Sequence, residues 1–411
     1  MEKIFFKLLV SSLGGQFIAL ISYVIVAKNF NPSNYGDYSI AISVASFLIP
    51  LATLRVDQRL YSELSPKSVS RMVRIGTFFT LYISAILISI SQVMRFCSSD
   101  WNVSFQDKLL FIGLITLSLG LSNIYFSYTI FMGQINTIKT WPIKQNLSYL
   151  IFIAFFGWIS PTVLALVLSI VISRLFPPFL FLLSRISNKS ISLSPRINYQ
   201  DVKEIFNKGK LAIVIALCDQ SIVAIPVIGL YSLFSANVAG IASLAVLILQ
   251  APSGLISSTI TSAIMLALSG RDQKRSSLAL DLTNKYIKRQ FIIIIIFGTF
   301  TILCVFLLQY VNFGKWNGIL VVIAAQTFPI YLMTLWIPLS SILQSLGLWA
   351  LRARIGVFQL ILVCMPFIFA KFFHSRWQNF VIWYSLVNLT VILISCYVAY
   401  SGIRKSSKLD V

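Results

Sequence analysis

Two ionisable residues lie inside long apolar stretches of the sequence, where a charge is costly. Arg174 lies in the apolar run 162–183, and Asp219 lies in the apolar run 211–233. At 1.5 Å per helical residue, each is roughly 12–15 Å from the nearer polar segment. Such residues usually face a cavity or a partner. Three interpretations stay open: the two residues pair, Arg174 snorkels to the membrane surface, or Arg174 binds an anionic substrate group while Asp219 binds a proton or cation.

A second group of charges follows the second apolar run. Arg55, Asp57 and Arg59 lie within five consecutive residues. Guanidinium groups match the geometry of phosphate oxygens, so the two arginines are candidate substrate ligands. The simpler interpretation is an ordinary basic flank on the cytoplasmic side of a span. Gln16 is a further candidate within the first run. Because it follows two glycines, close helix packing explains this stretch equally well.

The composition places these residues in a membrane protein. Of 411 residues, 57% are hydrophobic and 11% are charged, against about 25% charged in soluble domains. The net charge of +21 could suggest nucleic acid. We expect no nucleic-acid partner, because no polar stretch is long enough to fold as such a module. The basic excess instead fits contact with anionic membrane lipids and a cytoplasmic charge bias.

The apolar runs predict twelve membrane spans. An apolar helix of about 20 residues crosses a hydrocarbon core about 30 Å thick. The predicted spans are 8–27, 38–54, 75–94, 109–131, 146–158, 162–183, 211–233, 238–268, 291–308, 318–346, 355–370 and 377–403. With both termini in the cytoplasm, the inner segments hold 26 Lys and Arg residues and the outer segments hold 6. This bias supports an even number of spans and fixes their direction.

The spans form two similar halves. Several spans of the second half start about 203–216 residues after their counterparts in the first, and a large basic loop follows the second span of each half. We predict an N-terminal six-helix bundle over 1–183, a cytoplasmic linker over 184–210 and a C-terminal six-helix bundle over 211–411. This parallel repeat is typical of secondary transporters, which bind substrate between the halves.

Prolines interrupt two of the predicted spans. Pro252 lies in the eighth span, and Pro329 and Pro338 lie in the tenth. Proline frees a backbone carbonyl and bends a helix, so these positions are candidate hinges; a fixed packing kink explains them equally well. No P-loop, paired carboxylates or metal-ligand spacing occurs in the sequence. We therefore expect a transporter with no catalytic residues, metal site or cofactor.

Three stretches, in order along the chain, carry a resemblance to a known family. The first joins Gly14-Gly15-Gln16, the turn 31–38 (NPSNYGDY) and the exit 54–57 (LRVD). The second is 239–244 (AGIASL) with 252–255 (PSGL), and the third is 338–347 (PLSSILQSLG). The chain resembles the O-antigen and polysaccharide flippases (Wzx-type), within the larger superfamily that includes MATE exporters.

The resemblance implies a V-shaped, MATE-like, all-α fold with a central cavity between two bundles. The substrate would be an undecaprenyl-diphosphate-linked oligosaccharide, moved to the periplasmic leaflet of a bacterial inner membrane and driven by an ion gradient. A polysaccharide polymerase and a chain-length regulator would be possible partners. Arg174 and, more weakly, Arg55 and Arg59 would take the role that cationic cavity residues have in this family, which is to bind the diphosphate or acidic sugars. Few charged residues lie inside the spans here, which departs from a strongly cationic cavity.

Three other functions compete with the flippase. A drug or metabolite antiporter of the same fold predicts acidic cavity residues, and the span interiors offer only Asp219. A membrane enzyme such as a polymerase predicts a long outer loop, whereas the longest outer segment is 95–108. A scaffold that binds a partner through the basic inner loops is the third.

Overall fold

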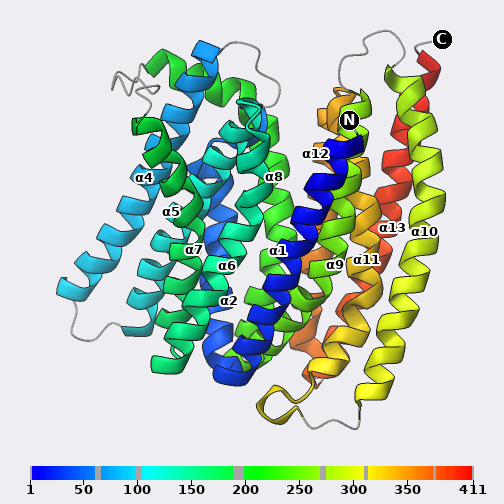
Figure 1. Cartoon of the computed structure of the whole chain (residues 1–411). Coiled ribbons are helices and arrows are strands. Elements are labelled where there is room, and N and C mark those ends of the chain that lie inside the picture. The colour runs from blue at the N-terminus through cyan, green and yellow to red at the C-terminus, as the bar shows by residue number, and fades with distance from the viewer. Residues whose placement is uncertain are drawn as a thin grey trace. The chain divides into compact units, whose positions relative to one another are not determined.

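The computed structural model describes residues 2–60, 66–97, 103–187, 199–268, 275–309, 313–373 and 376–409. These residues form twelve helices of at least 21 residues, the four-residue helix α3 and the short 3₁₀ helix η2 (Figure 1). The elements in chain order are α1 (Glu2–Asn29), α2 (Pro32–Ala52), α3 (Val56–Arg59), α4 (Pro66–Cys97), α5 (Val103–Phe131), α6 (Ile135–Ile159), α7 (Val163–Ser187), α8 (Tyr199–Leu233), α9 (Ala236–Leu268), α10 (Arg275–Leu308), η2 (Gly314–Trp316), α11 (Ile319–Ser345), α12 (Trp349–Phe373) and α13 (Trp377–Leu409).

The prediction of an all-helical membrane protein is confirmed. The twelve long helices follow the twelve predicted spans in number and order within the described residues. Ten of them are long and apolar enough to cross a membrane, and a further apolar stretch, Leu13–Asn29, belongs to α1. A membrane span must satisfy its backbone groups internally, which is why long apolar runs become helices.

The predicted helix ends differ from the observed ones. The segment 28–37 between the first two predicted spans is helical from Pro32, because proline at the first helical position needs no N–H partner. Helices α4, α8 and α10 begin well before their apolar runs. Their first turns hold polar and basic residues, which a helix outside the hydrocarbon core accommodates readily. The second predicted span ends early, at Ala52, because Leu54 and Arg55 both have positive φ, 50° and 53°.

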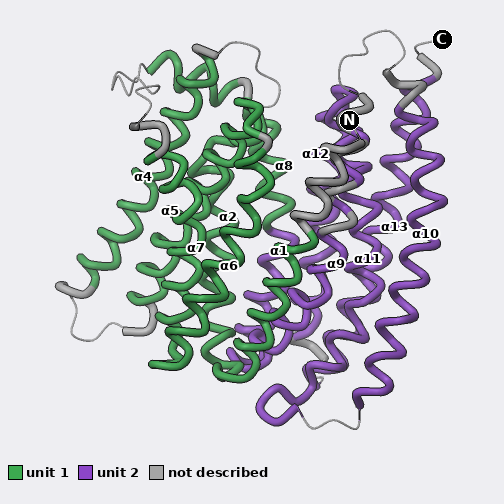
Figure 2. The backbone as a smooth tube through the Cα atoms, in the orientation of Figure 1, with its two compact units in different colours: residues 1–220 green, residues 221–411 purple. Residues whose placement is uncertain are grey.

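The chain divides into two compact units, residues Met1–Gln220 (unit 1) and Ser221–Val411 (unit 2) (Figure 2). The division falls inside α8, about ten residues after the end of the predicted linker. Residues 188–198 of that linker lie outside the described residues, and residues 199–210 form the start of α8.

In unit 1, α4 packs along α5, α1 along α6, and α7 against both α5 and α6. One end of this bundle holds a buried apolar core that joins α3, α4 and α5 to the start of α8 through Val56, Met72, Ile124 and Ile205. In unit 2, α11 is the central helix and packs against α9, α10 and α13. Its buried face supplies Leu335, Leu339, Ile342 and Leu343 to the core. Each unit thus has its own apolar core.

Gly120 allows α5 to approach α4 closely. A Cβ at Gly120 would lie 2.6 Å from Cγ2 of Thr80. Thr80 cannot easily give way, because its hydroxyl donates to the carbonyls of Gly76 at 2.8 Å and Ala52 at 3.2 Å. Gly120→Val is therefore expected to lower the free energy of unfolding by about 1–3 kcal/mol. Thermal unfolding of the purified protein in detergent measures this.

Gly254→Ala is the matched control, since a Cβ at Gly254 in α9 meets nothing within 4 Å. It should leave stability unchanged or raise it slightly, because alanine favours helix over glycine. Equal melting temperatures for the two variants would contradict the close α4–α5 contact.

Candidate functional site

Arg174 lies in the middle of α7. It is eleven residues from the start of the apolar span Val163–Leu183, or about 16 Å along the helix axis. With the Gln145 amide oriented so that its oxygen faces the arginine, that oxygen accepts hydrogen bonds from Nε and Nη1 of Arg174. Gln145 lies on α6 and is buried. The guanidinium is therefore held toward the neighbouring helix within unit 1, which does not support snorkelling.

Three tyrosines complete the surroundings of this arginine. Tyr23 of α1, Tyr38 of α2 and Tyr149 of α6 all interact electrostatically with Arg174. The hydroxyl groups of Tyr38 and Tyr149 share a hydrogen bond. We call these three tyrosines, Gln145 and Arg174 the Arg174 cluster. It brings together two pairs of consecutive helices of unit 1, α1 with α2 and α6 with α7, which are far apart in sequence from each other.

The Arg174 cluster contains a positive charge whose partners are neutral. Within the described residues, ion pairs join Arg55 to Asp57, Arg71 to Asp201 and Lys108 to Asp37, and none of these three includes Arg174. Arg174, Tyr23 and Tyr149 are only partly buried. A cation at this depth without a carboxylate can bind an anion by a two-pronged hydrogen bond, with tyrosine hydroxyls as additional donors.

Arg55 and Arg59 are held at the end of α2. Arg55 Nη1 lies 3.5 Å from Asp57 Oδ2, and both side chains are nearly buried. The Thr53 hydroxyl donates to the other carboxylate oxygen of Asp57 at 3.4 Å. Arg59 Nη1 donates to the carbonyl of Ile205 in α8 at 2.6 Å. The structure places these two predicted site residues in the same turn, and the contact of Arg59 fixes the turn after α2 to the start of α8.

The stretch around Gln16 makes a close contact between helices. The Asn146 side chain of α6 donates to the carbonyl of Gly15 at 2.8 Å. A Cβ at Gly15 would lie 3.3 Å from Cβ of Pro142. This is the close packing of α1 and α6 that the sequence allowed; Gln16 itself is half-buried.

Asp219 lies in α8, two residues before the start of unit 2, and is half-buried. It is about 15 Å along the helix from Gly209, where the apolar span begins. None of the ion pairs identified within the described residues joins Asp219 to Arg174, and the role of Asp219 stays a prediction.

The three prolines lie inside continuous helices, Pro252 in α9 and both Pro329 and Pro338 in α11. Pro338 has no N–H to donate to the carbonyl of Thr334, four residues earlier. The Tyr286 hydroxyl of α10 donates to that carbonyl at 2.5 Å. The neighbouring helix thus satisfies the carbonyl that Pro338 frees. Motion at these prolines stays a prediction.

Comparisons with known proteins give matches among solved structures. No family model and no curated protein matches the chain. An inward-facing multidrug resistance MATE family transporter of the MOP superfamily is 11% identical, with 96% of each chain covered and a TM-score of 0.66. MATE in complex with MaD5 is 12% identical, covering 99% of this chain and 97% of that one, with a TM-score of 0.65. The Vibrio cholerae MATE transporter VcmN in the bent form is also 12% identical, covering 99% and 98%, with a TM-score of 0.60.

This chain has the MATE transporter fold. The expected fold class is thereby confirmed over nearly the whole chain. At 11–12% identity this likeness shows the fold alone.

Several polar residues within this MATE fold escaped the sequence analysis. Gln145, Tyr23, Tyr38 and Tyr149 are neutral, and neutral polar residues are common enough in spans that spacing alone did not single them out. Arg352 was counted among the cytoplasmic charges. It lies on α12, is 1% exposed, and its guanidinium carbon lies 4.6 Å from the centre of the Trp336 ring of α11. The charge of Arg352 is thus stabilised inside unit 2 by a cation–π contact.

Proposed function

We propose that this protein is a flippase for undecaprenyl-diphosphate-linked repeat units of O-antigen or a related polysaccharide. It would act in the inner membrane of a bacterium, with both termini in the cytoplasm. The observation that carries the proposal is the Arg174 cluster, a mid-span cation whose partners are hydroxyl and amide groups. Such a group suits an anionic cargo.

The charged diphosphate is the part of this substrate that is hardest to move across the membrane. A bare diphosphate cannot cross hydrocarbon, because burying an isolated ion costs many kcal/mol. A guanidinium fork at mid-membrane offers the phosphate oxygens two parallel hydrogen bonds. Tyrosine hydroxyls can donate further hydrogen bonds, and tyrosine rings can pack against sugar faces. Gln145 would orient the guanidinium through its amide oxygen.

Other predicted residues take secondary roles in the proposal. Arg55 and Arg59 would make the first contact with the diphosphate at the cytoplasmic end of α2, and Gln16 would contribute a polar contact from α1. Pro252, Pro329 and Pro338 would absorb bending as access changes sides. A polymerase and a chain-length regulator would receive the product.

A second candidate is a cation-coupled antiporter for drugs or metabolites. Two observations favour it: solved structures of similar fold include multidrug resistance transporters, and Asp219 places a carboxylate within a span. The antiporter would use Asp219 to bind the driving ion, or a cationic substrate, and would give Arg174 no direct role.

Deletion and rescue in the native bacterium distinguish the two. For a flippase, deletion should abolish surface polysaccharide and trap single lipid-linked repeat units on the cytoplasmic face, and the gene should reverse both. Single units that reach the periplasm unpolymerised would indicate a polymerase. Unchanged surface polysaccharide, with altered drug sensitivity, would overturn the flippase proposal in favour of the antiporter.

A further inference from the structure

The first turns of α8 expose a regular stripe of aromatic and basic side chains. Tyr199, Lys203, Phe206 and Lys210 are spaced by four, three and four residues, which places them on one face of a helix. All four are exposed; Tyr199 is 77% exposed and Phe206 is 48% exposed. We call these four residues the α8 entry face.

The opposite side of the same turns is fixed to unit 1. Ile205 is buried in the apolar core of unit 1. Arg59 Nη1 donates to the Ile205 carbonyl at 2.6 Å, and Arg71 Nη1 pairs with Asp201 Oδ1 at 2.9 Å. The segment is therefore docked in one orientation, so its outward face is defined.

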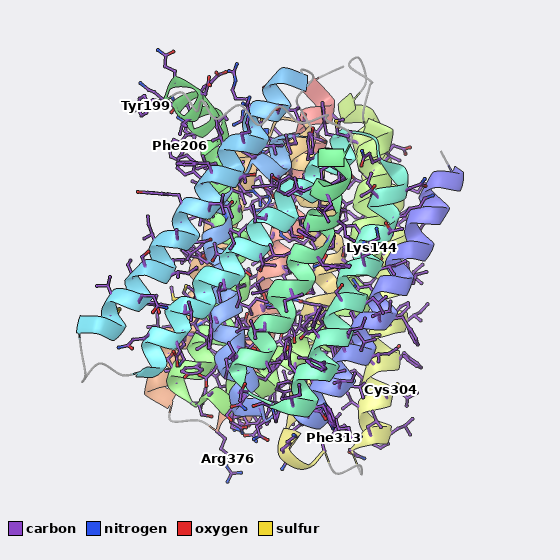
Figure 3. The ribbon with its side chains drawn as sticks, turned by 60° about the vertical axis from the view of Figure 1, so that its left-hand side comes forward. Lys144, Tyr199, Phe206, Cys304, Phe313 and Arg376 are labelled. Carbon is purple, nitrogen blue, oxygen red and sulfur yellow. The ribbon has the colours of Figure 1, made fainter. Side chains whose placement is uncertain are left out.

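Figures 1 and 3 show how the first turns of α8 lie on unit 1. In Figure 1 the first turns of α8 lie across the end of the unit 1 helices, at an angle to the rest of α8. Arg59 contacts this segment of α8 at two points, since its Nη1 donates to the Ile205 carbonyl and lies 3.6 Å from the position of a Cβ at Gly209. Figure 3 shows Tyr199 and Phe206 at the outer edge of unit 1. They point away from the helices beneath them.

We propose that the α8 entry face binds the headgroups of anionic phospholipids on the side of the membrane where α8 begins. The apolar span of α8 starts at Gly209, next to Lys210. Phe206 lies about one helical turn before it, or roughly 5 Å, which is within the headgroup region. Aromatic rings anchor at this interface, and lysines there are attracted to anionic lipids.

The charges around the stripe favour a lipid surface over other occupants. Asp201 is paired with Arg71, and the exposed Glu204 lies about 200° around the helix from Phe206 and about 100° from Lys203. The α8 entry face itself therefore consists of two lysines and two aromatic residues, and the exposed Glu204 lies beside it. This inference does not depend on the transported substrate. It predicts that lipid headgroups hold the start of α8, the helix in which the two units divide.

Titration of the full-length purified protein with phosphatidylglycerol, read by native mass spectrometry, tests the surface. Each lysine near a lipid surface strengthens binding by about fivefold, so Lys203→Gln with Lys210→Gln should weaken binding at this face by about 25-fold. Tyr199→Ser with Phe206→Ser should also weaken it. The control is Arg404→Gln with Lys405→Gln, which removes two exposed charges from α13. Equal loss in the control, or equal binding of phosphatidylcholine, would overturn the proposal.

Photocrosslinking identifies the occupant directly. The full-length protein with photoreactive benzoylphenylalanine at position 206 is irradiated in cells and in phosphatidylglycerol vesicles. A phospholipid adduct in both settings is expected. A protein adduct in cells as the main product would show that a partner protein covers this face and would overturn the proposal. Because neither assay uses transport, a negative result here leaves the flippase proposal standing, and the reverse is also true.

Discussion

Arg174→Ala is expected to reduce transport at least thirtyfold in proteoliposomes that carry a lipid-linked oligosaccharide diphosphate. Losing one partner of a desolvated, charge-assisted hydrogen bond costs about 2–5 kcal/mol, and 2 kcal/mol is roughly thirtyfold in affinity. Arg174→Lys should retain part of the activity, since it keeps the positive charge and loses the planar fork. The initial rate of appearance of substrate in the opposite leaflet measures both variants.

Removing Arg174 also leaves the buried Gln145 oxygen without its donor, which can lower stability by about 1–3 kcal/mol. Expression and melting temperature are therefore measured beside the rate, and Arg174→Lys separates a loss of charge from a loss of folding. Arg376→Ala is the matched control, because Arg376 is exposed at the start of α13. Normal transport by Arg174→Ala would remove this residue from the mechanism. Equal rates for the alanine and lysine variants would argue against recognition by charge.

The number and order of helices followed from the sequence because the membrane leaves few choices. Long apolar runs must be helical, and lysines and arginines mark their ends. The residues at which the helices begin and end were predicted less accurately. Helix α2 ends before Leu54 and Arg55, which both have positive φ although neither is glycine. No sequence pattern indicates positive φ at these two positions. The first turns of α8 are helical because Ile205 packs into the core of unit 1, a contact between segments far apart in sequence.

The candidate site was predictable in part for a similar physical reason. Arg174 stands out because a charge in an apolar run is rare and costly. The tyrosines around Arg174 did not stand out. Whether a tyrosine faces Arg174 depends on how α1 packs along α6, and how α2 and α6 pack against α7. The role of Arg59 was equally hidden: its acceptor, the Ile205 carbonyl, lies 146 residues later in the chain.

Asp219→Asn is expected to abolish accumulation of substrate against a gradient while leaving downhill exchange intact. Asparagine matches aspartate in shape and cannot carry the negative charge that binds a proton or cation. Asp219 lies about 15 Å into the span of α8, where a carboxylate is retained at a cost in stability. Proteoliposomes with an imposed proton or sodium gradient, compared with counterflow without a gradient, separate the two activities. Asp281→Asn is the matched control, since Asp281 is exposed on α10.

The result for Asp219→Asn also decides between the two proposed functions, because each gives this carboxylate a different role. In the flippase, Arg174 holds the cargo and Asp219 only couples the ion, so Asp219→Asn and Arg174→Ala should fail in different assays. In the antiporter, Asp219 binds the cation that is exchanged, so Asp219→Asn should abolish drug export in both assays and Arg174→Ala should have little effect. Full gradient-driven transport by Asp219→Asn would exclude this carboxylate as the coupling group. The driving force would then have to act through another group or through the lipid-linked substrate itself.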